Sequence, residues 1–205
     1  MEMSGLIRIL IADDDAVVRE GLTALINRRP DMQVIAEASN GVEAVDQFFR
    51  HQPDIALIDL RMPRRSGVEA MEAIRDRFPN AGLVVLTTYD SPEDVSSALH
   101  AGARGYLLKD GPIEELLQCI RTIYRGEAFI PAPIAAKLSP RLSSTRWDRQ
   151  DLEVRKLIAS GKSNQEIAAI LQIGEGEAAA RVVAILEKLG ITDRSLLRLI
   201  LPREN

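Results

Sequence analysis

Apolar residues in the first 125 positions gather in five short runs, and each run is followed by a stretch with helical spacing. The runs cover residues 6–11, 34–35, 55–58, 82–86 and 106–108. Continuous apolar runs of this length are typical of strands buried on both faces of a parallel sheet. Strands that alternate with helices predict an α/β fold, a doubly wound five-stranded parallel sheet with right-handed crossovers.

Residues that favour helix ends support this division. Asn40 with Gly41 precedes the second helical stretch, and Ser91 is a good N-cap ahead of Pro92 in the fourth. Pro112 precedes the fifth stretch, where proline suits the start of a helix. The sequence therefore places each helix between two strands, as a doubly wound sheet requires.

The pattern changes at Gly126. Residues 126–146 are rich in proline and serine and have no periodic apolar face beyond Ile134 and Leu138, which predicts a linker. Four short helical patterns follow at roughly 148–159, 164–171, 175–189 and 193–201. A short connection between the second and third of them predicts a small all-α domain with a helix-turn-helix.

Polar residues follow the predicted strands at their carboxyl ends. Asp13, Asp14 and Asp15 come directly after the first strand, Asp59 follows the third, and the fourth ends in Thr87. Lys109 follows the fifth strand. Because the carboxyl ends of parallel strands meet at one edge of a sheet, we expect these side chains to lie together. Clustered carboxylates repel one another unless a cation relieves them, so the pattern predicts a magnesium site.

Composition narrows the class of protein. The 205 residues are 46% apolar and 27% charged, which excludes disorder of the whole chain and allows two buried cores. The single cysteine, Cys119, forms no disulfide framework, and a buried thiol is the expected state. Arg8 and the three aspartates interrupt the N-terminal apolar stretch, and no run approaches the about 18 apolar residues of a membrane span. We therefore expect a cytoplasmic protein that does not enter the membrane.

Charge is unevenly distributed. Residues 1–140 hold 15 Lys and Arg against 21 Asp and Glu, while residues 141–205 hold 11 against 9, so the net charges are −6 and +2. Only the second part could favour nucleic acid, and weakly.

Several spaced motifs together resemble one family. They are IADDDAVVREGL, PDIALIDLRMPRRSGVEA, LVVLTTYD and AGARGYLLKD in the first part, and SNQEIAAIL and ILEKLGITDRS in the second. The chain is similar to two-component response regulators of the NarL/FixJ (LuxR-type) class. That resemblance implies a receiver domain over residues 1–125, a linker over 126–146 and a LuxR-type helix-turn-helix output domain over 147–205.

The resemblance implies roles for the residues at the sheet edge. Asp59 would accept a phosphoryl group from a cognate sensor histidine kinase, Lys109 would neutralise the phosphoryl oxygens, and Thr87 would donate a hydroxyl to them. Mg²⁺ would be held by Asp14, Asp59 and the backbone carbonyl of Arg61, with Asp13 acting through water. Tyr106 would swing inward when Thr87 is drawn to the phosphoryl group.

Two other interpretations of these residues are open. Asp13, Asp14 and Asp59 could be ordinary solvated loop carboxylates, and Asp15 is better explained as a helix-start cap. A phosphatase with an aspartyl nucleophile would use the same groups, but it needs a second carboxylate two residues after the nucleophile. Arg61 occupies that position, so we expect a regulator that loses its phosphoryl group slowly and not an enzyme.

The output domain departs from the resemblance at its recognition helix. Relatives present a serine cap followed by Thr, Val, Lys and His, whereas the matching positions here are Gly174, Glu177, Ala178, Ala179 and Arg181. Glu177 suits the helix dipole but repels the DNA backbone. The remaining candidates for DNA contact are Asn164, Gln165, Arg181 and Lys188. The domain therefore either binds DNA to control transcription or acts through protein contacts or dimerisation without DNA.

Two further features of this domain bear on its surfaces. Trp147 and Arg155 replace an expected leucine and an expected buried aliphatic residue, and Arg155 could reach the surface or pair at a remodelled interface. The last helix is crowded with apolar residues, namely Leu196, Leu197, Leu199, Ile200 and Leu201. Related regulators dimerise through this helix when phosphorylated, so we expect a homodimer in that state.

Overall fold

A computed structural model describes residues 5–138 and 147–200 of the chain. The N-terminal domain is built on a five-stranded parallel sheet with strand order β2-β1-β3-β4-β5. The strands are β1 (Ile7–Ala12), β2 (Met32–Ala38), β3 (Ile55–Ile58), β4 (Gly82–Thr87) and β5 (Gly105–Leu108). The predicted doubly wound α/β fold is confirmed.

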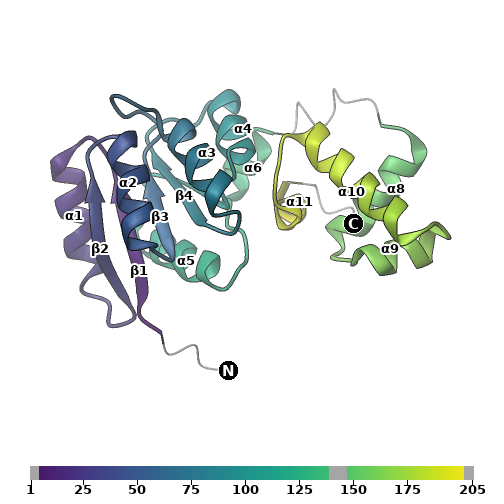
Figure 1. Cartoon of the computed structure of the whole chain (residues 1–205), viewed down its shortest axis with the longest axis horizontal. Helices are drawn as coiled ribbons and strands as arrows, with labels where there is room; N and C mark the ends of the chain where they lie inside the picture. The colour runs from purple at the N-terminus through teal and green to yellow at the C-terminus, as the bar shows by residue number, and fades with distance from the viewer. Residues whose placement is uncertain (1–4, 139–146, 201–205) are drawn as a thin grey trace.

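Five helices cover both faces of this sheet (Figure 1). They are α1 (Ala16–Ile26), α2 (Gly41–His51), α3 (Gly67–Arg77), α4 (Pro92–His100) and α5 (Ile113–Tyr124). Buried residues of α1 and α5 share one hydrophobic cluster, and those of α2, α3 and α4 share the other. In β1, Ile9 and Ile11 belong to the first cluster, whereas Leu10 and Ala12 belong to the second. The alternation of a strand explains why both faces are buried and why the run is apolar apart from the exposed Arg8.

Side-chain caps fix where the helices begin. Asp15 accepts hydrogen bonds from the backbone N–H groups of Val17 and Val18, so its expected role as an N-cap is confirmed. Ser66 and Glu69 form a capping box at the start of α3. Ser91 caps α4. These caps hold the loops that follow the strands, which are the loops that carry the polar residues.

The predicted linker is more ordered than its composition indicates. Backbone hydrogen bonds join Phe129 to Arg104 and Tyr106, and Phe129 forms a parallel bridge with Gly105. A short helix, α6 (Ala132–Ala136), follows, and Ile134 and its neighbours Ile130, Ala135 and Leu138 are buried. The apolar residues of this segment are too few to show a period, but each has a partner in the core. Residues 139–146 of the predicted linker lie outside the described residues.

The C-terminal domain is a helical unit that carries the predicted helix-turn-helix. Its helices are α8 (Arg149–Ala159), α9 (Asn164–Leu171), α10 (Glu175–Leu189), the 3₁₀ helix η1 (Arg194–Leu196) and α11 (Leu197–Ile200). Gly190 ends α10 in the left-handed conformation at φ +65°, which favours glycine. The turn between α9 and α10 carries Gln172 in the same conformation.

The last helix packs against other helices of the same chain and has most of its apolar residues buried. Leu196, Leu197 and Ile200 are buried, and α11 contacts α6 and α8 (Figure 1). Leu199 remains 38% exposed, and Leu201 lies outside the described residues. The small C-terminal bundle does not cover this helix alone, because α11 packs on α6 as well as on α8 and Leu199 stays exposed. No helix within residues 5–138 and 147–200 combines the length and apolarity needed to cross a bilayer.

Candidate functional site

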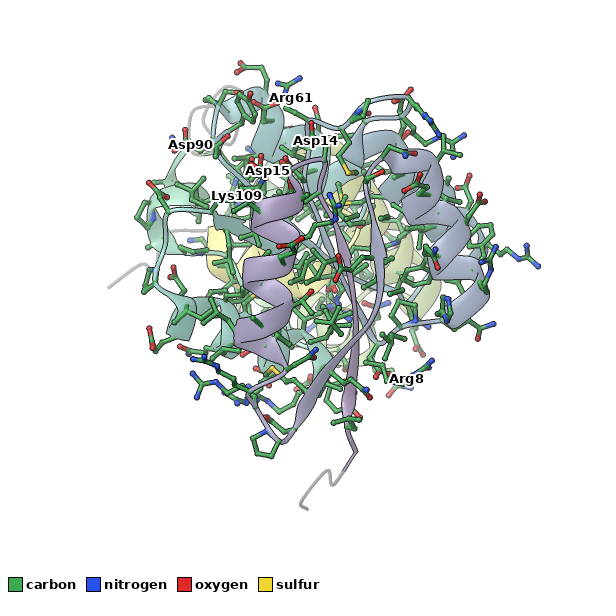
Figure 2. All side chains as sticks on the ribbon, turned by 90° about the vertical axis from the view of Figure 1, so that its left-hand side faces the viewer. Arg8, Asp14, Asp15, Arg61, Asp90 and Lys109 are labelled. Carbon is green, nitrogen blue, oxygen red and sulfur yellow. The ribbon has the colours of Figure 1, made fainter. Side chains whose placement is uncertain are left out.

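The predicted site residues gather at one edge of the sheet. In Figure 2, Asp14, Asp15, Arg61, Asp90 and Lys109 lie toward the same end of the N-terminal domain, and Arg8 lies at the opposite end. This is the carboxyl edge, where the loops after β1, β3, β4 and β5 meet. The expectation that strand order brings these side chains together is met by the fold.

The backbone around Asp59 is tightly held. The Asp59 N–H donates to the carbonyl of Ala12 at 2.8 Å, which ties the end of β3 to the end of β1. Gly67, the first residue of α3, lies so close that a Cβ there would be 2.0 Å from the carbonyl oxygen of Asp59. Only glycine fits this approach, so the start of α3 presses the Asp59 loop into a fixed position.

Three carboxylates converge at this edge. Asp13 and Asp59 are buried, Asp14 is exposed, and one oxygen from each lies within 4.8 Å of the others. Burial raises the pKa of Asp13, and this effect outweighs the hydrogen bond that its carboxylate accepts from Lys109. A hard cation with oxygen ligands would relieve the repulsion between these groups. Solvated loop carboxylates would not be buried in this way.

Lys109 connects the two buried carboxylates. Its Nζ lies 2.7 Å from Asp13 Oδ2 and 2.8 Å from Asp59 Oδ2. Burial alone would lower the pKa of Lys109, but the hydrogen bonds to Asp13 and Asp59 outweigh burial and raise it. The amine is therefore a fixed positive charge beside Asp59, available to an incoming anion.

One oxygen of Asp59 has no protein partner. Asp59 Oδ2 accepts from Lys109, whereas Asp59 Oδ1 is buried and makes no hydrogen bond within the described part of the chain. Buried polar atoms are nearly always hydrogen-bonded, and exceptions call for a role. An oxygen in this state fits a metal ligand or a nucleophile, and both uses suit a magnesium-dependent site.

Thr87 and Tyr106 are joined through the loop after β4. Thr87 is fully buried, and its Oγ1 accepts from the Tyr89 N–H at 3.4 Å. The Tyr106 hydroxyl donates to the Tyr89 carbonyl at 2.7 Å, and the Tyr106 ring is fully buried. Burial raises the pKa of the Tyr106 phenol. Tyr106 is thus already in the inward position that the sequence assigns to the phosphorylated state.

The side chains of Arg61 and Tyr89 contact each other at the carboxyl edge, and Asp94 pairs with Arg61. The sequence gives no sign of this role for Asp94. The Arg61 guanidinium lies 5.0 Å from the centroid of the Tyr89 ring and pairs with Asp94 at 2.7 Å. Asp94 is in the first turn of α4, where an acidic residue looks like an ordinary helix-start residue. Its link to Arg61 crosses 33 positions of sequence, which no local pattern contains.

A second missed contact joins the loop after β4 to the segment after the sheet. Lys137, at the C-terminal end of α6, pairs with Asp90 at 2.5 Å. Asp90 is three residues beyond Thr87 and next to Tyr89. The loop that carries the hydroxyl of Thr87 is therefore in direct contact with the segment that leads to the C-terminal domain.

The exposed face of α10 is apolar and acidic. Ala178, one of the positions expected to face DNA, is fully buried, so its assignment to the exposed face is wrong. The exposed residues of α10 are Glu175, Gly176, Glu177, Ala180, Val183, Ala184, Glu187 and Lys188. Val183 is 54% exposed. A helix that reads DNA usually presents cations and hydrogen-bonding groups on this face.

Three of the four other candidates for DNA contact, Asn164, Arg181 and Lys188, already have partners. Arg181 pairs with Glu177 at 3.1 Å on the surface of α10. Lys188 pairs at 2.5 Å with Asp151, a buried residue of α8. Asn164 accepts from Arg194 at 3.1 Å, whereas Gln165 is exposed. These cations neutralise the domain's own carboxylates, so less charge is free for phosphates.

Trp147, just before α8, and Arg155, within α8, lie against each other. The Arg155 guanidinium lies 5.1 Å from the centroid of the Trp147 ring, and Lys188 Nζ lies 5.5 Å from it. Of the two interpretations of Arg155, the structure supports pairing at a remodelled interface, because Trp147 replaces the expected leucine at the contact. The sequence shows Trp147 and Arg155 as two separate departures from the family pattern. The structure shows that these two side chains contact each other.

Comparisons with known proteins agree with this architecture. Residues 9–121 match the family model of the response regulator receiver domain, and residues 149–200 match that of bacterial regulatory proteins of the luxR family. The chain is 37% identical over 201 residues to the oxygen regulatory protein NreC of Staphylococcus aureus, covering 91% of this chain and 93% of the relative.

Solved structures give the same result. A LuxR-family two-component response regulator from Aurantimonas sp. SI85-9A1 is 34% identical with a TM-score of 0.63, covering 67% of this chain and 98% of that chain. The response regulator ChrA of a heme-sensing two-component system is 32% identical with a TM-score of 0.56. That comparison covers 96% of this chain and 100% of the other.

Proposed function

Because this chain belongs to the LuxR-type two-component response regulators, we propose that phosphorylation of Asp59 by a sensor histidine kinase controls how the output domain acts in transcription. Membership in these families assigns the chain a receiver domain and a DNA-binding domain of transcription regulators, and neither is an enzyme family. The observation that carries the assignment to Asp59 is its buried, unpartnered Oδ1 beside Lys109.

The proposed roles follow from the positions of the groups. An Asp59 carboxylate oxygen attacks phosphorus, the bond from phosphorus to the histidine nitrogen of the kinase breaks, and the electron pair leaves with that nitrogen. Lys109 neutralises the phosphoryl oxygens. Asp13, Asp14, Asp59 and the backbone carbonyl of Arg61 would hold Mg²⁺, which supplies positive charge to the transferring group when bound.

The proposed switch runs through the loop after β4. When the Thr87 hydroxyl turns to a phosphoryl oxygen, it gives up the hydrogen bond from the Tyr89 N–H. Tyr89 and Asp90 also contact Tyr106 and Lys137. A movement of this loop is therefore passed to α6, and α6 contacts α11 of the output domain.

The side chains over the site give a prediction for the lifetime of the phosphoryl group. Arg61 and Tyr89, two residues beyond Asp59 and Thr87, contact each other, and we propose that they obstruct a water that approaches Asp59. Substitution Arg61→Ala or Tyr89→Ala should speed loss of the phosphoryl group by about threefold to tenfold, a barrier lowered by roughly 0.7–1.4 kcal/mol. The decay of purified phosphoprotein, followed by intact mass, measures this. Thr88→Ala, an exposed neighbour, is the control.

The double variant sharpens this test. Because the two side chains support each other, Arg61→Ala with Tyr89→Ala should decay little faster than the faster single variant. Decay rates that equal the wild-type rate in all three variants would show that these side chains do not shield Asp59.

A prediction on assembly follows from the burial of α11. Leu196, Leu197 and Ile200 are occupied by contacts within the chain, so the unphosphorylated protein should be a monomer. We propose that phosphorylation releases α11 from α6 and allows a homodimer. Light scattering with and without beryllofluoride, a phosphoryl mimic, should show the mass double. A monomer under both conditions would contradict the proposal.

A matched pair of variants locates the proposed dimer contact. Leu199 on α11 and Leu152 on α8 are both 38% exposed. Leu199→Glu should prevent dimerisation, because it places a charge in an apolar contact. Leu152→Glu adds the same charge to another helix and should leave the dimer intact.

One observation favours a second function for the output domain. Residues 147–205 hold 9 Lys and Arg against 9 Asp and Glu, so this domain carries no net charge. The exposed face of α10 is apolar and acidic, and Arg181 and Lys188 pair with carboxylates of the same domain. The domain could therefore act through protein contacts or dimerisation without gripping DNA.

Selection of genomic DNA fragments separates the two functions. The protein is treated with acetyl phosphate and Mg²⁺, mixed with sheared genomic DNA at near-physiological salt, and the retained fragments are sequenced. Enrichment of discrete fragments only after phosphorylation supports transcriptional control by DNA binding. Retention of no fragment above background in either state supports the function without DNA.

A further inference from the structure

A crevice of about 320 Å³ opens between the receiver and the output domain. Its polar lining comes from both, with Arg75, Asn80 and Arg104 on the receiver and Thr192, Asp193 and Arg194 on the output domain. The crevice is separate from the carboxyl edge that holds Asp59. The phosphorylation mechanism uses none of these residues.

The lining is rich in hydrogen-bond donors and contains one negatively charged acceptor. Three guanidinium groups, a threonine hydroxyl and a side-chain amide meet one carboxylate, which leaves a net charge of +2. Guanidinium groups match oxyanions because each presents a planar fork of N–H donors. A surface of this composition favours an anion with several oxygens.

The one carboxylate does not satisfy the arginines around it. Arg104 Nε lies 2.8 Å from Asp193 Oδ2, and both side chains are largely buried, with exposures of 16% and 19%. Arg104 Nη2 also donates to the carbonyl of Gly126. Asp193 is thus the carboxylate that balances Arg104, and the lining offers no second carboxylate for Arg75.

Arg75 carries the receiver charge that Asp193 leaves uncompensated, because Asp193 pairs with Arg104. Its Nη1 donates to the carbonyl of Gly102 at 2.8 Å, a neutral acceptor. Burial lowers the pKa of Arg75, Asp193 opposes this, and the like charge of Arg104 adds to it. Two arginines of the receiver thus face one carboxylate of the output domain.

We propose that this crevice binds a small phosphorylated compound, with its phosphate oxygens on Arg75 and Arg104, since Arg194 already donates to Asn164 and to the carbonyl of Lys162. Ligand pockets have volumes of about 300–1,000 Å³. A crevice at the lower end of that range suits a mononucleotide or a smaller phosphorylated molecule. The phosphate competes with Asp193 for the guanidinium groups of the receiver.

Binding at this place has a consequence for the two domains. Because the residues of the site come from both domains, the ligand binds only when they are docked. A ligand with this preference shifts the population toward the docked arrangement. Ligand binding at this site would thus regulate the arrangement of the two domains in addition to phosphorylation by the kinase.

Calorimetric titration of the full-length protein with inorganic pyrophosphate tests the proposal. A chelator removes divalent metal, so that the Asp59 site does not contribute. Wild-type protein should bind one equivalent, and Arg75→Gln should weaken binding by about tenfold or more, since it removes a charged hydrogen-bond donor from the phosphate. Arg50→Gln changes the net charge equally at an exposed position of α2 and should leave the affinity unchanged.

A second substitution gives the opposite result. Asp193→Asn removes the competing carboxylate and should tighten binding, and asparagine can still accept the capping hydrogen bond from the Ser195 N–H. Absence of binding to wild-type protein, equal weakening by Arg75→Gln and Arg50→Gln, or weaker binding by Asp193→Asn would each overturn the proposal. Arg75→Lys, which keeps the charge and loses the fork, replaces Arg75→Gln if the latter does not fold.

Discussion

Substitution Asp59→Asn is expected to abolish phosphoryl labelling of this protein by acetyl phosphate in the presence of Mg²⁺. The reason is positional, because Asp59 is the buried carboxylate that lies beside Lys109 and keeps one oxygen without a protein partner. An amide oxygen in its place is not a nucleophile toward phosphorus. Intact mass spectrometry should find one added phosphoryl group on wild-type protein and none on the variant.

The variant should fold normally, so loss of labelling is not a loss of structure. Asparagine keeps an oxygen that can accept from Lys109, and Lys109 also keeps its contact with Asp13 at 2.7 Å. The loop is held as well by the hydrogen bond from the residue 59 N–H to Ala12 and by Gly67. Thermal unfolding of the variant provides the check.

An exposed aspartate serves as the matched control. Asp46→Asn on α2 removes a carboxylate that lies outside the site and should not change labelling. Undiminished labelling of Asp59→Asn would show that another residue accepts the phosphoryl group. Peptide mapping would then identify that residue, and Asp13, the other buried carboxylate on Lys109, would be the first candidate.

Much of the receiver site could be predicted from sequence because two local rules suffice. Apolar runs mark the strands, and parallel strands place their carboxyl ends at one edge. Asp13, Asp59 and Lys109 each follow a strand directly and Thr87 ends one, so their meeting requires only the strand order. The family resemblance adds roles to residues whose positions the pattern already indicates.

Contacts made by helix faces and by the segment after the sheet could not be predicted in this way. Asp94 looks like a helix-start acid and instead holds Arg61, and Lys137 looks like a linker residue and instead holds Asp90. Both contacts depend on how one element docks on another. The burial of Ile134 in α6 is of the same kind, because its partners lie far away in the sequence.

The recognition helix α10 shows a second limit of prediction from sequence. The sequence identifies missing cations on α10 correctly, but it cannot fix the rotation of the helix. The resemblance places Ala178 on the face exposed to DNA, but Ala178 is buried, whereas Val183 is exposed. A helix phase follows from the packing of α10 against α8 and α9, since neighbouring residues of a helix point in directions about 100° apart.

Restoring the missing groups on α10 is expected to restore DNA affinity at low salt. Glu177→Thr with Ala179→Lys removes one negative charge and adds one positive charge, and loss of Glu177 also frees Arg181 from its ion pair. Val183→Lys adds a further cation one turn beyond residue 179, at a position that is 54% exposed. Each new phosphate contact should steepen the dependence of log affinity on log salt by about 0.9.

Wild-type protein should show the opposite behaviour. A protein that neutralises about 6–10 phosphates loses a factor of about 10³–10⁵ in affinity between low and moderate salt. Residues 147–205 of this output domain carry no net charge, so we expect weak binding to random duplex and a clearly shallower slope. Fluorescence anisotropy over a salt series measures both quantities.

A matched control separates local contact from total charge. Glu114→Thr with Gln118→Lys makes the same change of charge on α5, where Glu114 is also in the first turn of its helix and both residues are exposed. Only the α10 variants should gain affinity, because α5 lies on the receiver. Tight, sequence-selective binding by the unmodified protein at near-physiological salt would contradict the weakened recognition helix and leave ordinary transcriptional control through Gln165, Arg181 and the preceding helix.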